Sequence, residues 1–338
     1  MYTMSRLRFI KKKPIHKLAE ILPEIFSQRF KKGDKVAVKL HMGEYGNINY
    51  IRPIWARTVV DALKSAGTEP FLFDSPTLYK KKRHTVSDYH QTAKMNGYTE
   101  ETMGCPIIIS DEGVEHKTEH LDVSVCNDIA DADGMVVLTH IKGHICTGIG
   151  GAIKNLGMGA VSKKTKSDIH EGCKPVIAEG CISCGKCVEV CPGDCFKLAE
   201  GKKLEMDLAT CYGCSICVLN CPAEALKSKF ALFYTLIAEG ASAVLKKLEG
   251  KSVYYINLLY DLSEKCDCVD TYNPLIAPNI GVLAGYDIAA IDQASIELIN
   301  KKAGKKVFDL RHKRPSELHI SEAERLGIGS REYDIEDT

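Results

Sequence analysis

Two stretches decide the fold of the middle of this chain: CISCGKCVEVCP at residues 181–192 and CYGCSICVLNCP at residues 211–222. Both have the spacing C-x2-C-x2-C-x3-C, and a proline follows each run. Two copies of this run are typical of bacterial-type ferredoxins, in which eight thiolates hold two 4Fe–4S clusters. The sequence therefore predicts an iron–sulfur module that carries electrons one at a time at low potential.

The spacing also predicts which cysteines share a cluster. Three cysteines separated by two residues each can wrap around one cluster, whereas the fourth is turned away by the following proline. We therefore expect each cluster to take three ligands from one run and one from the other. The two expected ligand sets are Cys181, Cys184, Cys187 with Cys221, and Cys211, Cys214, Cys217 with Cys191.

Two alternatives explain these cysteines less completely. A zinc ribbon uses two C-x2-C pairs and would leave half of the cysteines without a role. Disulfides need an oxidising compartment, which nothing in the sequence indicates. A ninth cysteine of this stretch, Cys195, is expected to be a small buried residue, because the eight ligand positions are already filled.

Length and charge set broader limits. The chain has 338 residues, enough for two or three domains, and its 45 basic and 44 acidic residues give a net charge of +1. This balance argues against a dedicated nucleic-acid or membrane-surface binder. No apolar run is long enough to span a membrane, and residues 1–13 lack the apolar segment of a signal peptide. With fifteen cysteines we expect a cytoplasmic, reducing location, and the oxygen-sensitive ligand sets indicate an anaerobic setting.

Strands and helices alternate along the first 173 residues. The patterns predict helices at 15–30, 53–65 and 88–96, and strands at 35–40, 70–73, 106–109 and 134–139. The last of these strands is almost entirely apolar, as expected for a strand covered on both faces. The expected fold class is therefore α/β, a mostly parallel sheet with helices on both faces.

The alternation returns after the cysteine-rich stretch. It predicts helices at 230–248 and 288–302 and strands at 253–259, 280–284 and 307–310, the last at an edge of the sheet. Because this part carries few elements of its own, we expect it to complete the first domain. The predicted organisation is a discontinuous α/β core of residues 1–173 and 230–338. A ferredoxin-type (α+β) insertion at 174–229 interrupts it, with a small hairpin around Gly201.

A glycine-rich loop follows the strand at 134–139 and holds His140, His144 and Lys154. Ligands of open α/β sheets bind beyond the carboxyl ends of the strands. His41, at the end of the strand at 35–40, is expected at the same rim, and His170 follows in the sequence. We interpret these five residues as candidate catalytic residues, because histidine transfers protons and lysine binds anionic groups.

Each of these features also has a plainer interpretation. The glycines lack the Gly-Lys-Ser/Thr of a phosphate loop and suit ordinary turns, and a single histidine is often only a hydrogen-bonded structural residue. The basic runs at 11–13, 80–83 and 163–164 are expected on the solvated surface. Cys266 and Cys268 flank Asp267, and they either bind an additional metal, assist redox chemistry or are free thiols in a turn.

Several motifs taken together resemble those of a known family. They are residues 41–47, which read His-Met-Gly-Glu-Tyr-Gly-Asn, and residues 50–53, 74–79, 140–159, 266–268, 279–284 and 290–294. The chain resembles the domain-of-unknown-function family three-six-two, in the form that carries an inserted two-cluster ferredoxin module. The resemblance covers nearly the whole chain and implies the fold and the two clusters, but no assigned activity. The chain departs from the family pattern after Asp287, where members often carry a proline.

A shorter resemblance concerns residues 150–154, Gly-Gly-Ala-Ile-Lys, together with His170. They are similar to the corresponding residues of nickel-pincer lactate racemases. The resemblance implies that Lys154 tethers a cofactor, that His170 ligates nickel, and that His140 and His144 act as acid and base. It implies chemistry on a small hydroxy acid.

The leading hypothesis is an iron–sulfur redox protein, a ferredoxin-linked oxidoreductase. It would pass electrons through two 4Fe–4S clusters to a substrate or metal bound over the sheet. An external redox partner, such as a ferredoxin or a reductase, would supply the electrons. Two alternatives stay open: a ferredoxin-like electron carrier whose α/β part docks a partner enzyme, and a metal-dependent, racemase-like enzyme. The sequence also leaves open whether the chain forms a homodimer.

Overall fold

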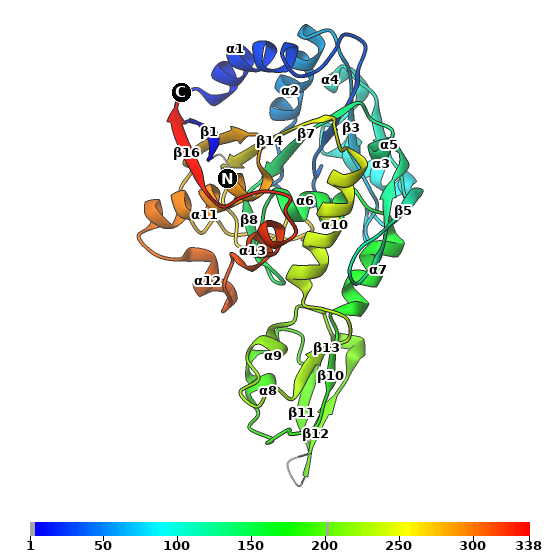
Figure 1. Cartoon of the computed structure of the whole chain (residues 1–338), viewed down its shortest axis with the longest axis vertical. Coiled ribbons are helices and arrows are strands. Elements are labelled where there is room, and N and C mark those ends of the chain that lie inside the picture. The colour runs from blue at the N-terminus through cyan, green and yellow to red at the C-terminus, as the bar shows by residue number, and fades with distance from the viewer. Residues whose placement is uncertain (1–3, 201–202) are drawn as a thin grey trace.

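The computed structural model describes residues 4–200 and 203–338, which form a large α/β lobe and a small cysteine-rich lobe (Figure 1). An eight-stranded sheet runs through the large lobe. Its strands lie in the order β16 (Tyr333–Asp337), β1 (Ser5–Ile10), β15 (Gly281–Gly285), β14 (Ser252–Leu259), β7 (Gly134–His140), β2 (Lys35–Lys39), β3 (Glu69–Asp74) and β4 (Ile107–Ile109). The pairings are parallel except for those of β15 with β1 and β14. The large, mostly parallel sheet expected from the sequence is confirmed.

The central strand β7 shows why the sheet is covered on both faces. All seven of its residues are buried. Met135 and Val137 belong to one hydrophobic core, and Val136 and Leu138 belong to the other. Since side chains alternate between the faces of a strand, an apolar run supplies both cores at once.

Helices form the two outer layers. One core takes apolar side chains from α1 (Pro14–Ser27), α2 (Pro53–Ser65), α3 (Val86–Met95) and α4 (Glu100–Met103). The other takes them from α5 (Asn127–Ala130), α6 (Ala152–Gly159), α7 (Lys163–Gly172), α10 (Phe233–Lys247), α11 (Ile288–Ala303), α12 (Val307–His312) and α13 (Leu318–Arg325). Two hairpins complete this lobe, β5 (Gly113–Lys117) with β6 (Asp122–Cys126), and β8 (Lys142–His144) with β9 (Gly148–Gly150).

Glycines allow α6 and α10 to pack closely. A Cβ atom on Gly157 would meet the carbonyl of Ile237, and one on Gly240 would lie 2.7 Å from the carbonyl of Gly157. Helix α10 begins just after the small lobe, so this contact also anchors the chain where it re-enters the large lobe.

A pair of strands connects the small lobe to the large lobe (Figure 1). Strand β10 (Pro175–Ile177) leaves the large lobe and pairs antiparallel with β13 (Leu226–Ser228), which returns to it. Between them lie α8 (Lys186–Val190), the hairpin of β11 (Phe196–Leu198) and β12 (Leu204–Met206), the 3-10 helix η2 (Leu208–Thr210) and α9 (Ile216–Leu219). The predicted hairpin is confirmed in its strands, although Gly201 lies outside the described residues.

One element prediction is wrong. Residues 307–310 form the start of helix α12 and not an edge strand. The edge next to β1 is occupied by β16, which the sequence patterns did not reveal. Val307 and Phe308 are adjacent buried residues, which one helical turn can turn toward the core together, whereas a strand would send them to opposite faces.

Among the residues that the structure describes, no helix combines the length and the apolar character that crossing a bilayer requires.

Candidate functional site

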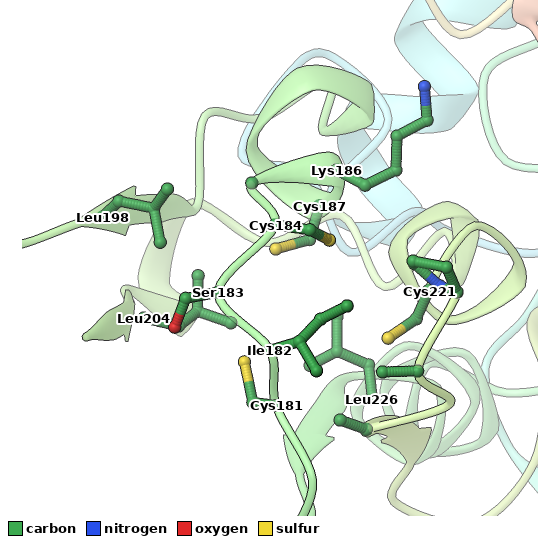
Figure 2. Close-up of a pocket in the computed structure, with 14 residues that line it drawn as sticks. Cys181, Ile182, Ser183, Cys184, Lys186, Cys187, Leu198, Leu204, Cys221 and Leu226 are labelled. Atoms are coloured by element: carbon green, nitrogen blue, oxygen red, sulfur yellow. The ribbon is translucent and has the colours of Figure 1, made fainter. Parts of the chain in front are cut away.

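Four cysteines from two segments surround one small cavity in the small lobe. They are Cys181, Cys184, Cys187 and Cys221. Figure 2 shows their sulfur atoms on different sides of a shared space, with Ile182 and Leu226 among the apolar residues of its wall. The set contains three cysteines of the first run and the last cysteine of the second run.

The remaining four cysteines also lie close together. Burial and the neighbouring Cys214, Cys211 and Cys191 raise the pKa of the Cys217 thiol. Two of these sulfurs already accept backbone hydrogen bonds, Cys211 from the N–H of Gly213 at 3.4 Å and Cys191 from the N–H of Cys195 at 3.4 Å. Gly213 has a φ of 62°, a conformation that glycine adopts without strain.

These two donor sets fit iron–sulfur clusters. Each offers four sulfur atoms in largely apolar surroundings, which is the ligand type that such clusters take. Backbone N–H groups aimed at ligand sulfurs stabilise the negative charge of a cluster and tune its potential. Cys195 is a buried residue beside Cys191, and its burial agrees with the expectation from the sequence.

The second cysteine run is held against the large lobe at several points. The Nη1 atom of Arg314, on the segment after α12, donates to the carbonyls of Cys146 at 2.8 Å and Cys214 at 3.0 Å. The Nδ1–H of His170, on α7, donates to the carbonyl of Tyr212 at 3.1 Å. The residues around Cys214 are therefore fixed in position relative to the sheet.

A cavity of about 940 Å³ lies between this run and the sheet. Its wall includes Cys191 and Cys211 of the small lobe, and His41, His144, Lys154 and His170 of the large lobe. The structure thus brings four of the five candidate catalytic residues to one cavity, beside two of the cysteines expected to hold the second cluster. Most of the large-lobe contributors lie at or after the carboxyl ends of β2, β3 and β7, as the sheet rule predicts.

His140 is not brought there. Its Nδ1 atom lies 2.9 Å from a carboxylate oxygen of Asp267, and its Nε2 atom lies 2.9 Å from the carbonyl of Tyr260. Lys142 approaches the other oxygen of Asp267 at 3.2 Å. His140 and Lys142 therefore hold the buried carboxylate of Asp267 in place. The histidine has a positioning role, because both of its nitrogens contact protein groups outside the cavity.

The cavity is strongly cationic. Its lining contains eleven lysine or arginine residues and four aspartate or glutamate residues. Burial opposes the charge of Lys154, but the neighbouring Cys266 and Cys268 outweigh it and raise its pKa. At the base of the cavity, the ammonium of Lys39 lies 3.0 Å from the carboxylate of Asp74 and donates to Asn155 at 2.7 Å. Such surroundings favour an anionic ligand.

His144 lies in the wall as a neutral ring. Burial and the nearby charge of Lys154 hold its pKa well below the ordinary value of histidine. The Nδ1 atom of His144 accepts the backbone N–H of Cys146 at 3.1 Å. The Nε2 atom then carries the proton of the neutral ring.

The two thiols flanking Asp267 lie side by side in the wall of the cavity. The Sγ atoms of Cys266 and Cys268 lie 3.3 Å apart, and the Sγ of Cys268 lies 3.4 Å from the Nε2 of His41. A hydrogen bond from Cys266 and the charge of Arg83, opposed by burial, hold the pKa of Cys268 well below the usual range of a thiol. These surroundings favour the thiolate form of Cys268, with Cys266 as the neighbour that donates a hydrogen bond to it.

The burial of Arg83 contradicts one expectation from the sequence. The basic run at 80–83 was expected on the surface, yet the Arg83 side chain is only 1% exposed and pairs with Glu44 at 3.2 Å. Its Nη2 atom has no hydrogen-bond partner within the described residues. No periodicity distinguishes Arg83 from its exposed neighbours, since a loop after β3 folds it inward.

Comparison with known proteins places the chain in a family. A family model described as Domain of unknown function (DUF362) matches residues 36–297. The chain belongs to this family. The match begins in β2 and ends in α11, so it includes both the cavity and the small lobe.

Two curated relatives match shorter segments. The pyruvate synthase subunit PorD of Methanothermobacter marburgensis is 32% identical over 80 residues, which are 23% of this chain and 90% of that protein. An uncharacterized protein of the rpl9-rpl11 intergenic region of Porphyra purpurea is 36% identical over 55 residues, 14% of this chain and 73% of that protein.

Solved structures show only distant similarity. A crystal structure of a Thermotoga maritima protein aligns over 90% of this chain with 10% identity and a TM-score of 0.45. The lactate racemase apoprotein of Thermoanaerobacterium thermosaccharolyticum aligns over 77% with 12% identity and a TM-score of 0.36. The chain spans 60% and 51% of the lengths of these two chains.

Proposed function

We propose that this protein passes low-potential electrons from an external donor through two 4Fe–4S clusters to an anionic ligand in the cationic cavity. One observation carries the proposal: Cys191 and Cys211 line the same cavity as Lys154 and His170. A bound cluster supplies single electrons at low potential. The cysteine sets of the small lobe would hold the clusters as residues 181, 184, 187 with 221, and 211, 214, 217 with 191.

The two lobes have different parts in this proposal. Residues 174–229 form the ferredoxin-type insertion, and residues 1–173 with 230–338 form the core that binds the ligand. The similarity to PorD, which is named as a pyruvate synthase subunit, supports iron–sulfur electron transfer and the use of a separate redox partner. A ferredoxin or a reductase would dock on the small lobe.

Residues of the large lobe would bind the ligand and donate hydrogen bonds to it. Lys154 is charged and offers an ammonium group for an anion. The pKa of His144 lies well below its ordinary value, so the ring is neutral and its Nε2–H can donate a hydrogen bond to a group that gains an electron. His170 bridges the two parts of the site, because it lines the cavity while its Nδ1–H holds Tyr212.

The alternatives make different demands on the cavity. A pure electron carrier would have no use for a large, cationic cavity with buried ionisable groups. A racemase-like enzyme would use Lys154 and His170 around a metal cofactor, and both residues do line the cavity. It would have no use for cluster ligands in the same wall.

The test uses protein prepared without oxygen. We expect about eight iron and eight sulfide ions per chain and a paramagnetic signal after reduction with dithionite. We then expect the reduced protein to be reoxidised faster by the anionic anthraquinone-2,6-disulfonate than by cationic methyl viologen derivatives of similar potential, because the exit site is cationic.

Two variants separate the hypotheses. Lys154→Ala should slow reoxidation by the anionic dye about three- to tenfold with iron content unchanged. Lys164→Ala, an exposed lysine on α7 outside the cavity, is the matched control and should have no effect. Equal rates for Lys154→Ala and the parent protein would favour the pure carrier, and nickel in the purified protein would favour the racemase-like enzyme.

A further inference from the structure

The structure places Cys268 in the cavity with three hydrogen-bonding or charged neighbours, Cys266, His41 and Arg83. The Sγ of Cys266 donates to the Sγ of Cys268 at 3.3 Å. The ring of His41 approaches Cys268 from the end of β2 at 3.4 Å. Arg83 lies close enough for its charge to act on Cys268, and its Nη2 atom has no hydrogen-bond partner within the described residues. The Sγ of Cys268 is thus close to groups that stabilise a thiolate.

The tautomer of His41 determines whether its Nε2 atom can bind a metal or donates a hydrogen bond to the thiolate of Cys268. The backbone N–H of Gly43 donates to the Nδ1 atom of His41 at 3.0 Å. Nδ1 is therefore an acceptor, and the proton of the neutral ring lies on Nε2, the atom that faces Cys268. An Nε2–H group donates a hydrogen bond to a thiolate, whereas a metal ligand would need a free lone pair at that nitrogen.

The carboxylate of Asp267, which lies between the two cysteines in the sequence, also has other partners than a metal. Asp267 pairs with His140 at 2.9 Å and with Lys142 at 3.2 Å. Two thiols then remain, fewer than the three or four protein ligands of a zinc site. Within residues 4–200 and 203–338, three potential ligand atoms lie within 4.8 Å of one another only at Glu119, His120 and Glu239, which do not line this cavity. The geometry favours thiol chemistry over an additional metal.

We propose that Cys268 and Cys266 are a redox-active dithiol that reduces small anionic disulfides entering the cationic cavity. The thiolate of Cys268 attacks one sulfur of the substrate, forms a mixed disulfide and releases the first thiolate. Cys266 then attacks the Sγ of Cys268 and loses its proton to water in the cavity. The second thiolate leaves, and a Cys266–Cys268 disulfide remains. Two electrons have passed from the protein dithiol to the substrate disulfide.

The anionic character of the substrate follows from the lining. Cationic side chains outnumber acidic ones eleven to four, and Lys154 lies near both thiols. A volume of about 940 Å³ accommodates a ligand the size of a short peptide disulfide. The inference rests on the proposed function only for the two electrons and one proton that return the disulfide to the dithiol.

Oxidised glutathione, a net-negative disulfide, is the test compound, and cationic cystamine is its counterpart. Trypsin cleaves after Lys265 and Lys301, so residues 266–301 form one peptide that contains Cys266 and Cys268 and no other cysteine. After anaerobic incubation and blocking of free thiols, mass spectrometry of this peptide distinguishes a dithiol, an internal disulfide and a mixed disulfide.

We expect the internal disulfide in the parent protein, formed at least about tenfold faster with oxidised glutathione than with cystamine. Cys266→Ser should stop at a glutathionyl adduct on Cys268, and Cys268→Ser should form no adduct. Cys105→Ser, which removes a buried thiol outside the cavity with a pKa raised to about 11 by burial, should behave as the parent.

Three results would overturn this inference: no disulfide in the parent, an adduct in Cys268→Ser as fast as in Cys266→Ser, or no preference for the anionic disulfide. Iron content and the paramagnetic signal are measured on the same samples. Missing clusters with intact disulfide chemistry would refute the proposed electron transfer alone. Intact clusters without disulfide chemistry would refute the dithiol alone.

Discussion

The Nε2–H of His41 faces the Sγ of Cys268 at 3.4 Å, although 227 positions separate the two residues in the chain. The contact joins the carboxyl end of β2 to the loop that follows β14. These strands lie on opposite sides of β7 in the sheet. The residues after the strands therefore meet at one rim, and a neutral histidine donor is brought to a thiolate.

The first prediction concerns this pair. Replacing His41 by Phe removes one hydrogen bond to the thiolate and should raise the pKa of Cys268, because a hydrogen bond to a charged group is worth about 1.5–3 kcal/mol. At pH 6.5 we expect alkylation of Cys268 by iodoacetamide to slow about tenfold or more. The measurement is the pH–rate profile of labelling in the peptide of residues 266–301.

His41→Gln is the matched variant, because its side-chain amide can still donate a hydrogen bond. Its profile should lie between those of the parent and His41→Phe. The profile of His41→Phe should move toward higher pH. Identical profiles for all three proteins would show that His41 does not stabilise the thiolate.

The second prediction concerns the crosswise ligand sets. Cys181→Ser and Cys221→Ser should each lose the same cluster, and the double variant should retain about four irons, as each single variant does. Combining Cys181→Ser with Cys191→Ser should instead remove both clusters. Iron and sulfide analysis of anaerobic protein measures the outcome.

Cys195→Ser is the control for this series and should retain both clusters, because Cys195 packs against its neighbours without completing a ligand set. If Cys181→Ser and Cys221→Ser proved additive, with no iron left in the double variant, the ligand sets would be assigned incorrectly.

The third prediction concerns Arg314, which ties the second cysteine run to the large lobe. Its guanidinium donates to the carbonyls of Cys146 and Cys214, and the residue is only 4% exposed. Arg314→Met removes both bonds, so we expect hydrogen exchange in residues 211–215 to accelerate about tenfold or more. Arg311→Met is the control, because that side chain is half-exposed and pairs with Glu264, away from the second cysteine run. Unchanged exchange in Arg314→Met would mean that other contacts hold this segment.

The fourth prediction concerns pH and Lys166, a buried lysine on α7 whose ammonium donates to the hydroxyl of Ser75 at 2.7 Å. Burial lowers its pKa from 10.5 to about 8. Between these pH values the unfolded chain binds more protons than the folded protein, so the free energy of unfolding rises with pH. The contribution is about 3 kcal/mol across the window, and below pH 8 the buried charge opposes folding.

Lys166→Met removes this titration. We therefore expect the parent to gain about 2–3 kcal/mol relative to Lys166→Met between pH 7.5 and 10, measured by anaerobic urea unfolding. Lys164→Met changes an exposed lysine of the same helix and should show no such difference. Parallel pH curves for the parent and Lys166→Met would contradict the assignment.

Much of the fold follows from local patterns. The apolar run of β7 and the amphipathic pattern of α1 predict their own structure, because burial on two faces or on one stripe requires such sequences. Strands β1 and β16 were missed, since each pairs with a segment from the other end of the chain, which local patterns do not reveal. Val307 and Phe308 were misassigned because two adjacent apolar residues do not distinguish a strand from a helical turn.

Some residues of the candidate site could likewise be predicted from local patterns, whereas others could not. His144, Lys154 and His170 were found because they stand in or near a glycine-rich loop after a predicted strand. Arg83 was expected on the surface and Asp267 had no assigned partner. Burial of a charge depends on groups that approach from other parts of the chain, such as Glu44 beside Arg83 and Lys142 beside Asp267.

The amino-acid sequence by itself determined the family, the α/β class and the two cysteine runs, because regular spacing and periodicity are local properties that the order of residues carries directly. Only the tertiary structure decided that one cavity contains cysteines of the small lobe, Lys154 and the Cys266–Cys268 pair. It also decided that His41 donates to Cys268 while His140 holds Asp267. Those relationships depend on the order of strands in the sheet and on burial, which long-range pairing sets and local sequence does not encode.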